Sequence, residues 1–232
     1  MNRFITSVLM LSLISSMILL SSFVEYDNYQ SKIDYTVYYT LNNQYNNKPE
    51  IDSIMTNKSN IEFIRENKLY EIESKLNKVE SIQEAHIFRD LNFNLSINIT
   101  EREPIAYYEK NDSYIDLSGK IIKRNKKLYD RLPLLLGDTS KNNIKKVVDV
   151  IKAFKEDGFL NQELERLWFK EDELFLKLKS FQFDIRFGDN NKMNKKLEML
   201  KGFCLYNMQN KENETYKQID LVYTNQLIAI KK

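Results

Sequence analysis

The chain has 232 residues, enough for one large domain or two small ones. Apolar residues make up 42% and aromatic residues 12%, which is typical of a folded protein and excludes a disordered chain. The formal net charge of +2 gives no large field of one sign, which argues against a nucleic-acid-binding protein. One cysteine and one histidine exclude an internal disulfide, a thiolate metal cage and a multi-histidine zinc site.

The N-terminus predicts a membrane anchor. Residues 4–24 carry no charge and are rich in Ile, Leu, Met and Phe. As a helix this stretch reaches roughly 31 Å, and the hydrocarbon core of a bilayer is about 30 Å thick. It lacks an Ala-x-Ala-like cleavage site, so we expect an uncleaved transmembrane helix, with a cleaved signal peptide as the alternative. A lipoprotein is excluded because the single cysteine is Cys204.

The charges around this stretch predict its orientation. Arg3 precedes it, and Glu25 and Asp27 follow it. The positive-inside rule therefore places residues 1–3 in the cytoplasm and the bulk of the chain outside it, after a linker over residues 25–31.

Residues 32–103 are expected to form a small α+β domain. Apolar side chains alternate from Ile33 to Tyr39 and again from Phe93 to Ile99, a period of two that predicts strands. The remaining predicted elements are a short helix, a longer helix and a strand, at Glu50–Met55, Asn67–Val79 and Ala85–Arg89. The order strand, helix, helix, strand, strand can close a domain with both helices on one face of the sheet.

Residues 104–232 are expected to form a mainly-β domain with two helices, at Asn142–Glu156 and Asn191–Met208. Because a proline cannot donate to a ladder, Pro133 excludes the extended run over residues 132–137 from a central sheet position. A turn over residues 224–226 predicts a terminal hairpin. The other predicted strands are Ile105–Tyr108, Ser113–Asp116, Ile121–Ile122, Leu174–Leu178, Phe181–Phe187, Ile219–Tyr223 and Leu227–Ile230.

No spacing of nucleophile, base and orienting group indicates catalysis, and five glycines leave little scope for a phosphate-binding loop. We therefore expect no enzymatic activity, cofactor or metal. His86 is expected to be structural or exposed, Cys204 to be a core residue, and Trp168 to be a core or interface anchor. The carboxylates that could be imagined as acid/base pairs are expected to lie at solvated strand ends: Glu101, Glu103, Asp116 and Asp220.

Several ordered segments resemble the FtsQ/DivIB family of bacterial division proteins: Glu101–Ala106, Tyr114–Gly119, Leu132–Gly137, Phe187–Gly188, Lys195–Leu197 and Ile219–Tyr223, followed by Ala229. The resemblance implies a single membrane anchor, a POTRA-like domain over residues 32–103 and a β domain over residues 104–232. Relatives often carry Asp-Leu-Arg-Tyr where this chain has Asp220-Leu221-Val222-Tyr223, so an arginine is replaced by Val222.

The resemblance further implies a non-enzymatic, single-pass divisome scaffold in the inner membrane, with its C-terminal part in the periplasm and concentrated at the septum. Its expected partners are FtsB/FtsL-type bitopic proteins, and its expected role is to help control septal peptidoglycan synthesis. An apolar final strand can bind a partner by adding a strand to the sheet edge. The predicted partner-binding residues are Leu221, Val222, Tyr223, Leu227, Ile228, Ala229 and Ile230. Two other classes stay open: an exported cell-wall enzyme, and a POTRA-bearing component of outer-membrane assembly or secretion.

Overall fold

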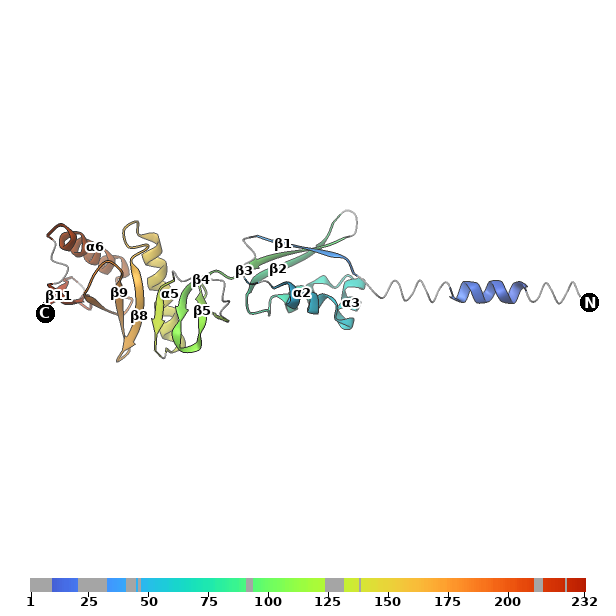
Figure 1. Ribbon diagram of the computed structural model, residues 1–232, viewed down its shortest axis with the longest axis horizontal. Coiled ribbons are helices and arrows are strands. Elements are labelled where there is room, and N and C mark those ends of the chain that lie inside the picture. Colours follow the sequence, from blue (N-terminus) through green and yellow to red (C-terminus); the bar gives the residue numbers. More distant parts are fainter. Residues whose placement is uncertain are drawn as a thin grey trace, which may run out of the picture. The chain divides into compact units, whose positions relative to one another are not determined.

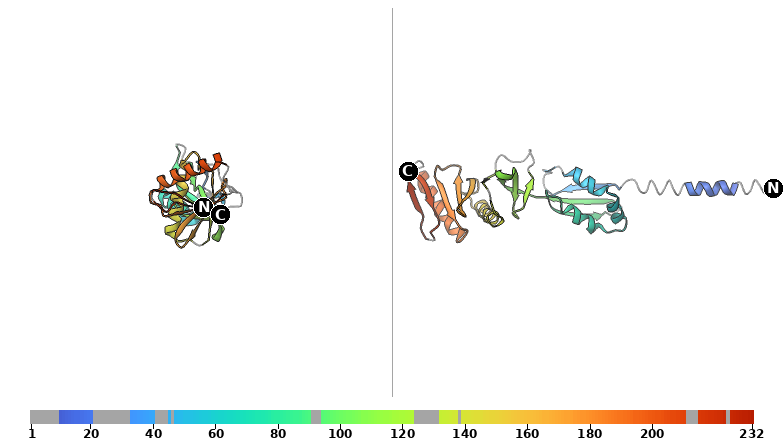
Figure 2. Two further views of the ribbon diagram at one scale, coloured as in Figure 1. Left: turned by 90° about the vertical axis from the view of Figure 1, so that its left-hand side faces the viewer. Right: turned by 90° about the horizontal axis from the view of Figure 1, so that it is seen from below.

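The protein is described here by a computed structural model, and Figures 1 and 2 trace its elements. The chain divides into two compact units, Met1–Glu101 and Arg102–Lys232. The structure describes residues 10–20, 33–40, 45, 47–90, 94–123, 132–137, 139–210, 215–223 and 225–232.

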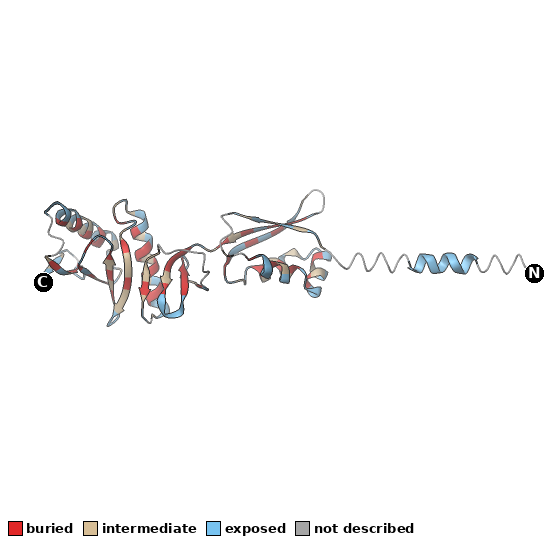
Figure 3. Ribbon diagram, in the orientation of Figure 1, coloured by how far each residue is buried: buried red, intermediate tan, exposed pale blue. Residues whose placement is uncertain are grey.

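Within the predicted membrane span, residues 10–20 form a helix whose apolar side chains are exposed (Figure 3). None of the helices in the described part of the chain is both long enough and apolar enough to cross a membrane. Residues 4–9 and 21–24 of the predicted span lie outside the described residues, as do the predicted tail and linker at 1–3 and 25–31. The transmembrane helix therefore stays a prediction.

The first unit is a three-stranded sheet with three helices against one face (Figure 1). Its sheet order is β1-β3-β2, with β1 parallel to β3 and β2 antiparallel to β3. The central strand β3 buries Leu95, Ile97 and Ile99 against the helices. The elements are β1 (Tyr35–Tyr39), α2 (Lys48–Met55), α3 (Lys58–Arg65), α4 (Leu69–Leu76), β2 (Ile82–Arg89) and β3 (Leu95–Glu101).

Within residues 32–103, sequence reasoning predicted two helices, whereas the described residues there form three. Helix α3 was missed, although Asn57 is an N-cap whose side chain accepts a hydrogen bond from the Ser59 amide. The predicted helix Asn67–Val79 is too long, because Asn67 has a φ of 58° and cannot continue a right-handed helix. The predicted start of the last strand at Phe93 lies outside the described residues.

The second unit is built on one mixed sheet of nine strands, in the order β12-β11-β10-β9-β8-β7-β4-β5-β6. The pairs β10–β11, β7–β8 and β4–β7 are parallel, and the other neighbouring pairs are antiparallel. The strands are β4 (Pro104–Tyr108), β5 (Ser113–Asp116), β6 (Ile121–Lys123), β7 (Leu134–Leu136), β8 (Leu164–Lys170), β9 (Glu173–Leu178), β10 (Asp184–Gly188), β11 (Tyr216–Asp220) and β12 (Ile228–Lys231). A 3₁₀ turn, η1, covers Glu109–Asn111.

Helices α5 (Lys141–Glu156) and α6 (Met193–Asn210) close the core of this unit. Ser140 is the N-cap of α5, and its hydroxyl accepts a hydrogen bond from the Asn143 amide. The helix buries Val147, Ile151 and Phe154. Helix α6 adds apolar side chains to the same core cluster. The residues at matching positions along the ladder, such as Leu167, Leu176, Ile185 and Ile219, lie in that cluster, so the helices cover one face of the sheet.

Two predictions for this unit were wrong. The run around Pro133 does form a central strand: β7 starts one residue later, and the Pro133 carbonyl accepts a hydrogen bond from the Tyr107 amide. Pro133 therefore joins β4 to the start of β7 through its carbonyl oxygen, although it has no amide hydrogen to donate. Strand β8 was missed, because a register shift between Leu164 and Arg166 interrupts the alternation of buried and exposed side chains.

Two predicted strands are displaced along the chain. Phe181 and Phe183 are buried but precede β10, which begins at Asp184. Strand β11 begins at Tyr216 and ends at Asp220, so residues 221–223 belong to the connection that follows it. The predicted terminal hairpin is present, because β11 and β12 pair antiparallel.

Candidate partner-binding edge

The predicted binding residues lie at one end of the nine-stranded sheet. Strand β12 is the terminal strand and pairs with β11, so Ile219 faces Ala229 and Asp220 faces Ile228 across the ladder. Among the described strands, β12 has no partner on its other side. An edge of this kind presents backbone donors and acceptors to an added strand.

The side chains of this strand are divided between two environments. Leu227 and Ala229 pack against the core cluster and hold the strand to the unit. Ile228 and Ile230 are 38% and 43% exposed. Because side chains alternate along a strand, these two isoleucines lie on the face opposite the core and form an apolar pair at the edge.

The connection between β11 and β12 holds the remaining predicted residues. Leu221 is fully buried, and its amide donates to the Arg186 carbonyl at 2.9 Å. The Val222 amide donates to Asp220 Oδ1 at 2.9 Å, which fixes the start of the connection. Val222 and Tyr223 are 36% and 47% exposed, so of the three residues only these two can offer side chains to a partner.

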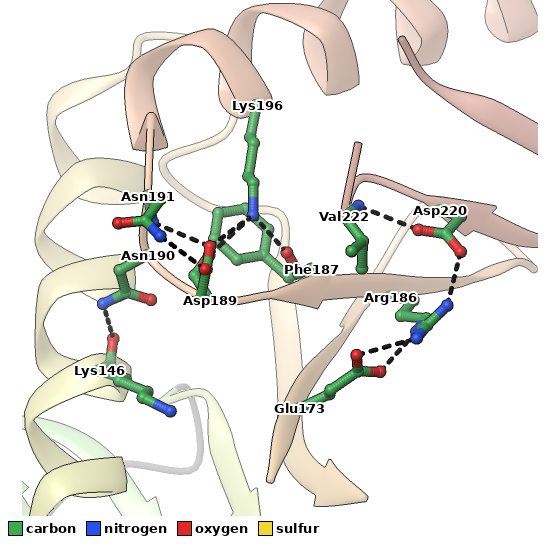
Figure 4. A network of polar contacts seen from close by, with 10 residues as sticks. All are labelled: Lys146, Glu173, Arg186, Phe187, Asp189, Asn190, Asn191, Lys196, Asp220 and Val222. Atoms are coloured by element: carbon green, nitrogen blue, oxygen red, sulfur yellow. Dashed lines mark hydrogen bonds and ion pairs between the residues drawn. The ribbon is translucent and has the colours of Figure 1, made fainter. Parts of the chain in front are cut away.

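Beside the connection, Arg186 joins two carboxylates from neighbouring strands (Figure 4). Its Nε and Nη2 donate to Glu173 Oε2 and Oε1 at 2.5 and 2.8 Å, and its Nη1 donates to Asp220 Oδ2 at 2.9 Å. The hydrogen bonds from Arg186 lower the pKa of Glu173, and both carboxylates raise the pKa of the guanidinium. The network therefore links β9, β10 and β11.

A buried amino group supports the same region from the core face. Lys196 is 3% exposed, and its Nζ donates to the carbonyls of Phe187 and Asp189, each at 2.8 Å (Figure 4). The amino group also lies 3.3 Å from Asp189 Oδ1 and 5.0 Å from the centroid of the Phe187 ring. These contacts hold the end of β10 against α6, the helix that carries Lys196.

Gly188 is required at this point for two reasons. Its φ of +73° lies in the left-handed region, which residues with a side chain rarely adopt. A Cβ built there would also lie 3.0 Å from Val222 Cγ2. The β11–β12 connection therefore packs directly on the backbone of β10.

The residues considered as possible acid/base pairs have separate structural partners. Glu101 accepts a hydrogen bond from Asn47 Nδ2 at 2.7 Å, and Glu103 lies 3.4 Å from Lys155 Nζ. Asp116 is paired with Arg102 at 2.6 Å, and Asp220 with Arg186. Glu101, Asp116 and Asp220 are also buried, which corrects the expectation that these groups lie at solvated strand ends.

The single histidine, cysteine and tryptophan of the chain lie in three different environments. His86 is exposed on β2 and lies 3.1 Å from Glu84. Cys204 is fully buried on α6, and desolvation raises the pKa of its thiol to about 12. Trp168 stacks on Phe175 with 5.7 Å between ring centroids. In the part of the chain that the structure describes, no group of three or more His, Cys, Asp or Glu side chains could hold a metal ion.

A shallow cleft of about 440 Å³ lies beside Trp168, on the face of the sheet that α5 and α6 leave uncovered. Its lining includes Leu136, Arg166 and Asp184. Sequence reasoning missed this feature because it depends on β8, which was not predicted, and on the pairing of β8 with β7 and β9.

The fold and the edge define a class of protein: an α+β protein whose C-terminal unit is a mixed sheet ending in a partly exposed apolar strand. A family model described as FtsQ/DivIB, C-terminal related, matches residues 103–230, which is more than half of the chain. The chain therefore belongs to the FtsQ/DivIB family and has a role in cell division. The comparison with curated proteins gave no match.

Proposed function

We propose that this protein is a bitopic divisome scaffold that binds an FtsB/FtsL-type partner along the β12 edge and thereby helps control septal peptidoglycan synthesis. The observation that carries the proposal is the position of β12, a terminal strand with Ile228 and Ile230 exposed on one face. An extended segment of the partner would pair with the β12 backbone, and its alternate side chains would contact the isoleucines.

Tyr223 is proposed as the side-chain anchor of this interface. Backbone pairing accepts many sequences, so discrimination between partners must come from side chains. Tyrosine is among the commonest interface hot spots, where truncation costs on the order of 2 kcal/mol or more, or about thirtyfold in affinity. The exposed fraction of Tyr223, 47%, leaves its ring available for such a contact.

The proposed scaffold is anchored by residues 4–24, with residues 1–3 in the cytoplasm and residues 25–232 outside it. The uncharged sequence supports the anchor, and so do the exposed apolar side chains of the helix over residues 10–20. Residues 32–103 are proposed to form a POTRA-like domain, since their sheet has helices on one face and a parallel β1–β3 pair.

The binding experiment compares the full chain with two edge variants and one control. Tyr223→Ala removes the anchor, and Ile228→Glu places a charge on the apolar face of β12. Tyr70→Ala is the matched control, because Tyr70 is 62% exposed on α4 of the other unit. We expect about thirtyfold weaker binding of an FtsB-type extracytoplasmic segment to each edge variant, and wild-type binding to the control.

If both folded edge variants bind the segment as tightly as the wild type, the docking site lies elsewhere.

Imaging a tagged copy in dividing cells tests the wider proposal independently. A ring at the septum is expected for a division scaffold, whereas an even envelope distribution would favour the exported-enzyme or outer-membrane-assembly classes.

A further inference from the structure

A second surface lies at the opposite end of the same sheet. A groove of about 610 Å³ is formed by helix α5 and by the turn that joins β5 to β6. In the sheet order, β6 is the terminal strand at one end and β12 is the terminal strand at the other. The groove is therefore separate from the candidate partner-binding edge and independent of the function proposed for that edge.

The floor of the groove is apolar. Ile144 and Val148, four residues apart on α5, lie beside Leu117, which is 39% exposed. The turn packs closely on this helix, since a Cβ added at Gly119 would lie 3.4 Å from Ile144 Cγ2 and 3.9 Å from Val148 Cγ2. Ile144 and Val148 are only 6% and 4% exposed, so Leu117 offers most of the exposed apolar surface of the floor to a ligand.

The turn that forms one wall is held in a single shape by Asp116. Its Oδ1 accepts hydrogen bonds from the amides of Ser118 and Lys120, each at 2.8 Å, and from the Ser118 hydroxyl at 2.7 Å. Its Oδ2 accepts from Arg102 Nη1 at 2.6 Å. A wall fixed in this way needs little reordering when a ligand binds, which favours affinity.

The rim of the groove is basic. Lys141, Lys145 and Lys152 share one face of α5, and Lys120 lies across from them on the turn. Within the described residues, none of these four amino groups is in an ion pair. Asp149 is the one carboxylate in the groove lining, and its Oδ2 lies 3.5 Å from Asn190 Nδ2.

We infer that this groove, called here the lysine groove, binds an acidic amphipathic segment of a protein partner. The apolar side chains of that segment would lie on Leu117, Ile144 and Val148, and its carboxylates would pair with the lysines. The volume is within the usual range of about 300–1,000 Å³ for ligand pockets, so the groove accepts a few side chains and not a folded domain.

Two other anionic ligands fit the groove less well. A membrane surface cannot follow a groove between a helix and a turn, and its phosphates would contact the lysines alone. A nucleic acid would leave the apolar floor without a contact, and the chain carries a net charge of only +2. The combination of an apolar floor and a lysine rim therefore favours an amphipathic peptide.

The test uses fluorescence anisotropy with a labelled synthetic peptide in which leucines share one helix face and glutamates flank them. The full chain is compared with Lys145→Glu/Lys152→Glu and with Leu117→Gln, which changes an exposed residue of the floor. The matched control is Lys58→Glu/Lys78→Glu, which reverses two exposed lysines of the other unit. Circular dichroism checks that every variant is folded.

We expect the double reversal to weaken peptide binding at least about tenfold and Leu117→Gln to weaken it about threefold, while the control pair binds as the wild type does. A peptide with lysines in place of the glutamates should not bind. The inference is overturned if the groove variants bind like the wild type, or if polyglutamate binds as tightly as the amphipathic peptide. It is also overturned if monomeric short-chain phosphatidylglycerol binds at the groove more tightly than the peptide.

Discussion

Replacing Gly188 by alanine should destabilise the C-terminal unit through two separate effects. The left-handed backbone of this residue, with a φ of +73°, costs a residue with a Cβ roughly 1–2 kcal/mol. The new methyl group would also meet Val222 Cγ2 at 3.0 Å, and overpacking of this kind costs about 1–3 kcal/mol. Together they predict a loss of about 2–5 kcal/mol in the free energy of unfolding.

A second background separates these effects. In a Val222→Ala chain the methyl contact disappears, so Gly188→Ala should then cost only the backbone part, about 1–2 kcal/mol. Gly202 provides the control: no atom lies within 4 Å of a Cβ built there, and alanine in the middle of α6 should stabilise the helix by up to about 1 kcal/mol.

Urea unfolding followed by tryptophan fluorescence measures these changes in the correct unit, because Trp168 is the sole tryptophan and lies on β8. A loss below about 0.5 kcal/mol for Gly188→Ala would refute the backbone argument. Equal losses in the two backgrounds would refute the contact with Val222 and, with it, the tight packing of the β11–β12 connection on β10.

Three further predictions concern the two cores. Leu95→Ala should cost roughly 2–5 kcal/mol in unfolding followed by circular dichroism, because Leu95 is 2% exposed on the central strand of the first sheet; a loss below about 0.5 kcal/mol would contradict this assignment. Burial alone would raise the pKa of Asp116, but hydrogen bonds from Ser118, Arg102 and the Lys120 backbone lower it below the ordinary 3.8. The stability contribution of this carboxylate is therefore complete above its unfolded pKa and is lost as the pH falls through the lower folded pKa, so Asp116→Asn should flatten the stability profile as the pH falls below about 5. Cys204, with its pKa raised to about 12 by burial, should react with iodoacetamide at pH 8 only as fast as the unit unfolds; modification at the rate of the unfolded chain would contradict this.

Sequence reasoning was most successful where one element carries its own pattern. The alternation of Leu95, Ile97 and Ile99 and the helical spacing of Ile144, Val147 and Ile151 predicted β3 and α5 close to their observed bounds. In both elements the buried face is continuous, so the periodicity of apolar residues alone predicts the type of element and its bounds.

The same reasoning failed where pairing determines the structure. Strand β8 contains a register shift, so its side chains do not alternate regularly, and the effect of Pro133 depends on whether its missing donor would face a neighbour. The network of Arg186, Glu173 and Asp220 joins three strands, and a single sequence does not show which residues the ladder brings together. The lysine groove was missed for the same reason, since its turn and its helix are separate in the chain.

The two proposed surfaces should respond differently to salt. At the proposed β12 interface, backbone hydrogen bonds and apolar contacts would dominate, because the apolar Val222 stands where the family resemblance leads us to expect an arginine. In the lysine groove the contacts are between exposed charges, which salt screens: the Debye length falls from about 10 Å at 0.1 M to about 3 Å at 1 M. Raising NaCl from about 0.05 M to 0.5 M should therefore weaken binding of the acidic amphipathic peptide severalfold, and should change binding of the FtsB-type segment by less than about twofold.

Measuring both affinities on the same full chain tests this difference without any substitution. A strong salt dependence at the edge would mean that charged groups near β12, such as Lys231, contribute to the interface, and the argument from Val222 would be wrong. If the affinity of the peptide does not change with salt concentration, the lysines do not contribute to its binding in the groove. Because the surfaces lie at opposite ends of one sheet, saturating the edge with the FtsB-type segment should leave the affinity of the peptide unchanged. Competition between the two ligands would show that they share a site, and the two proposals could not both hold.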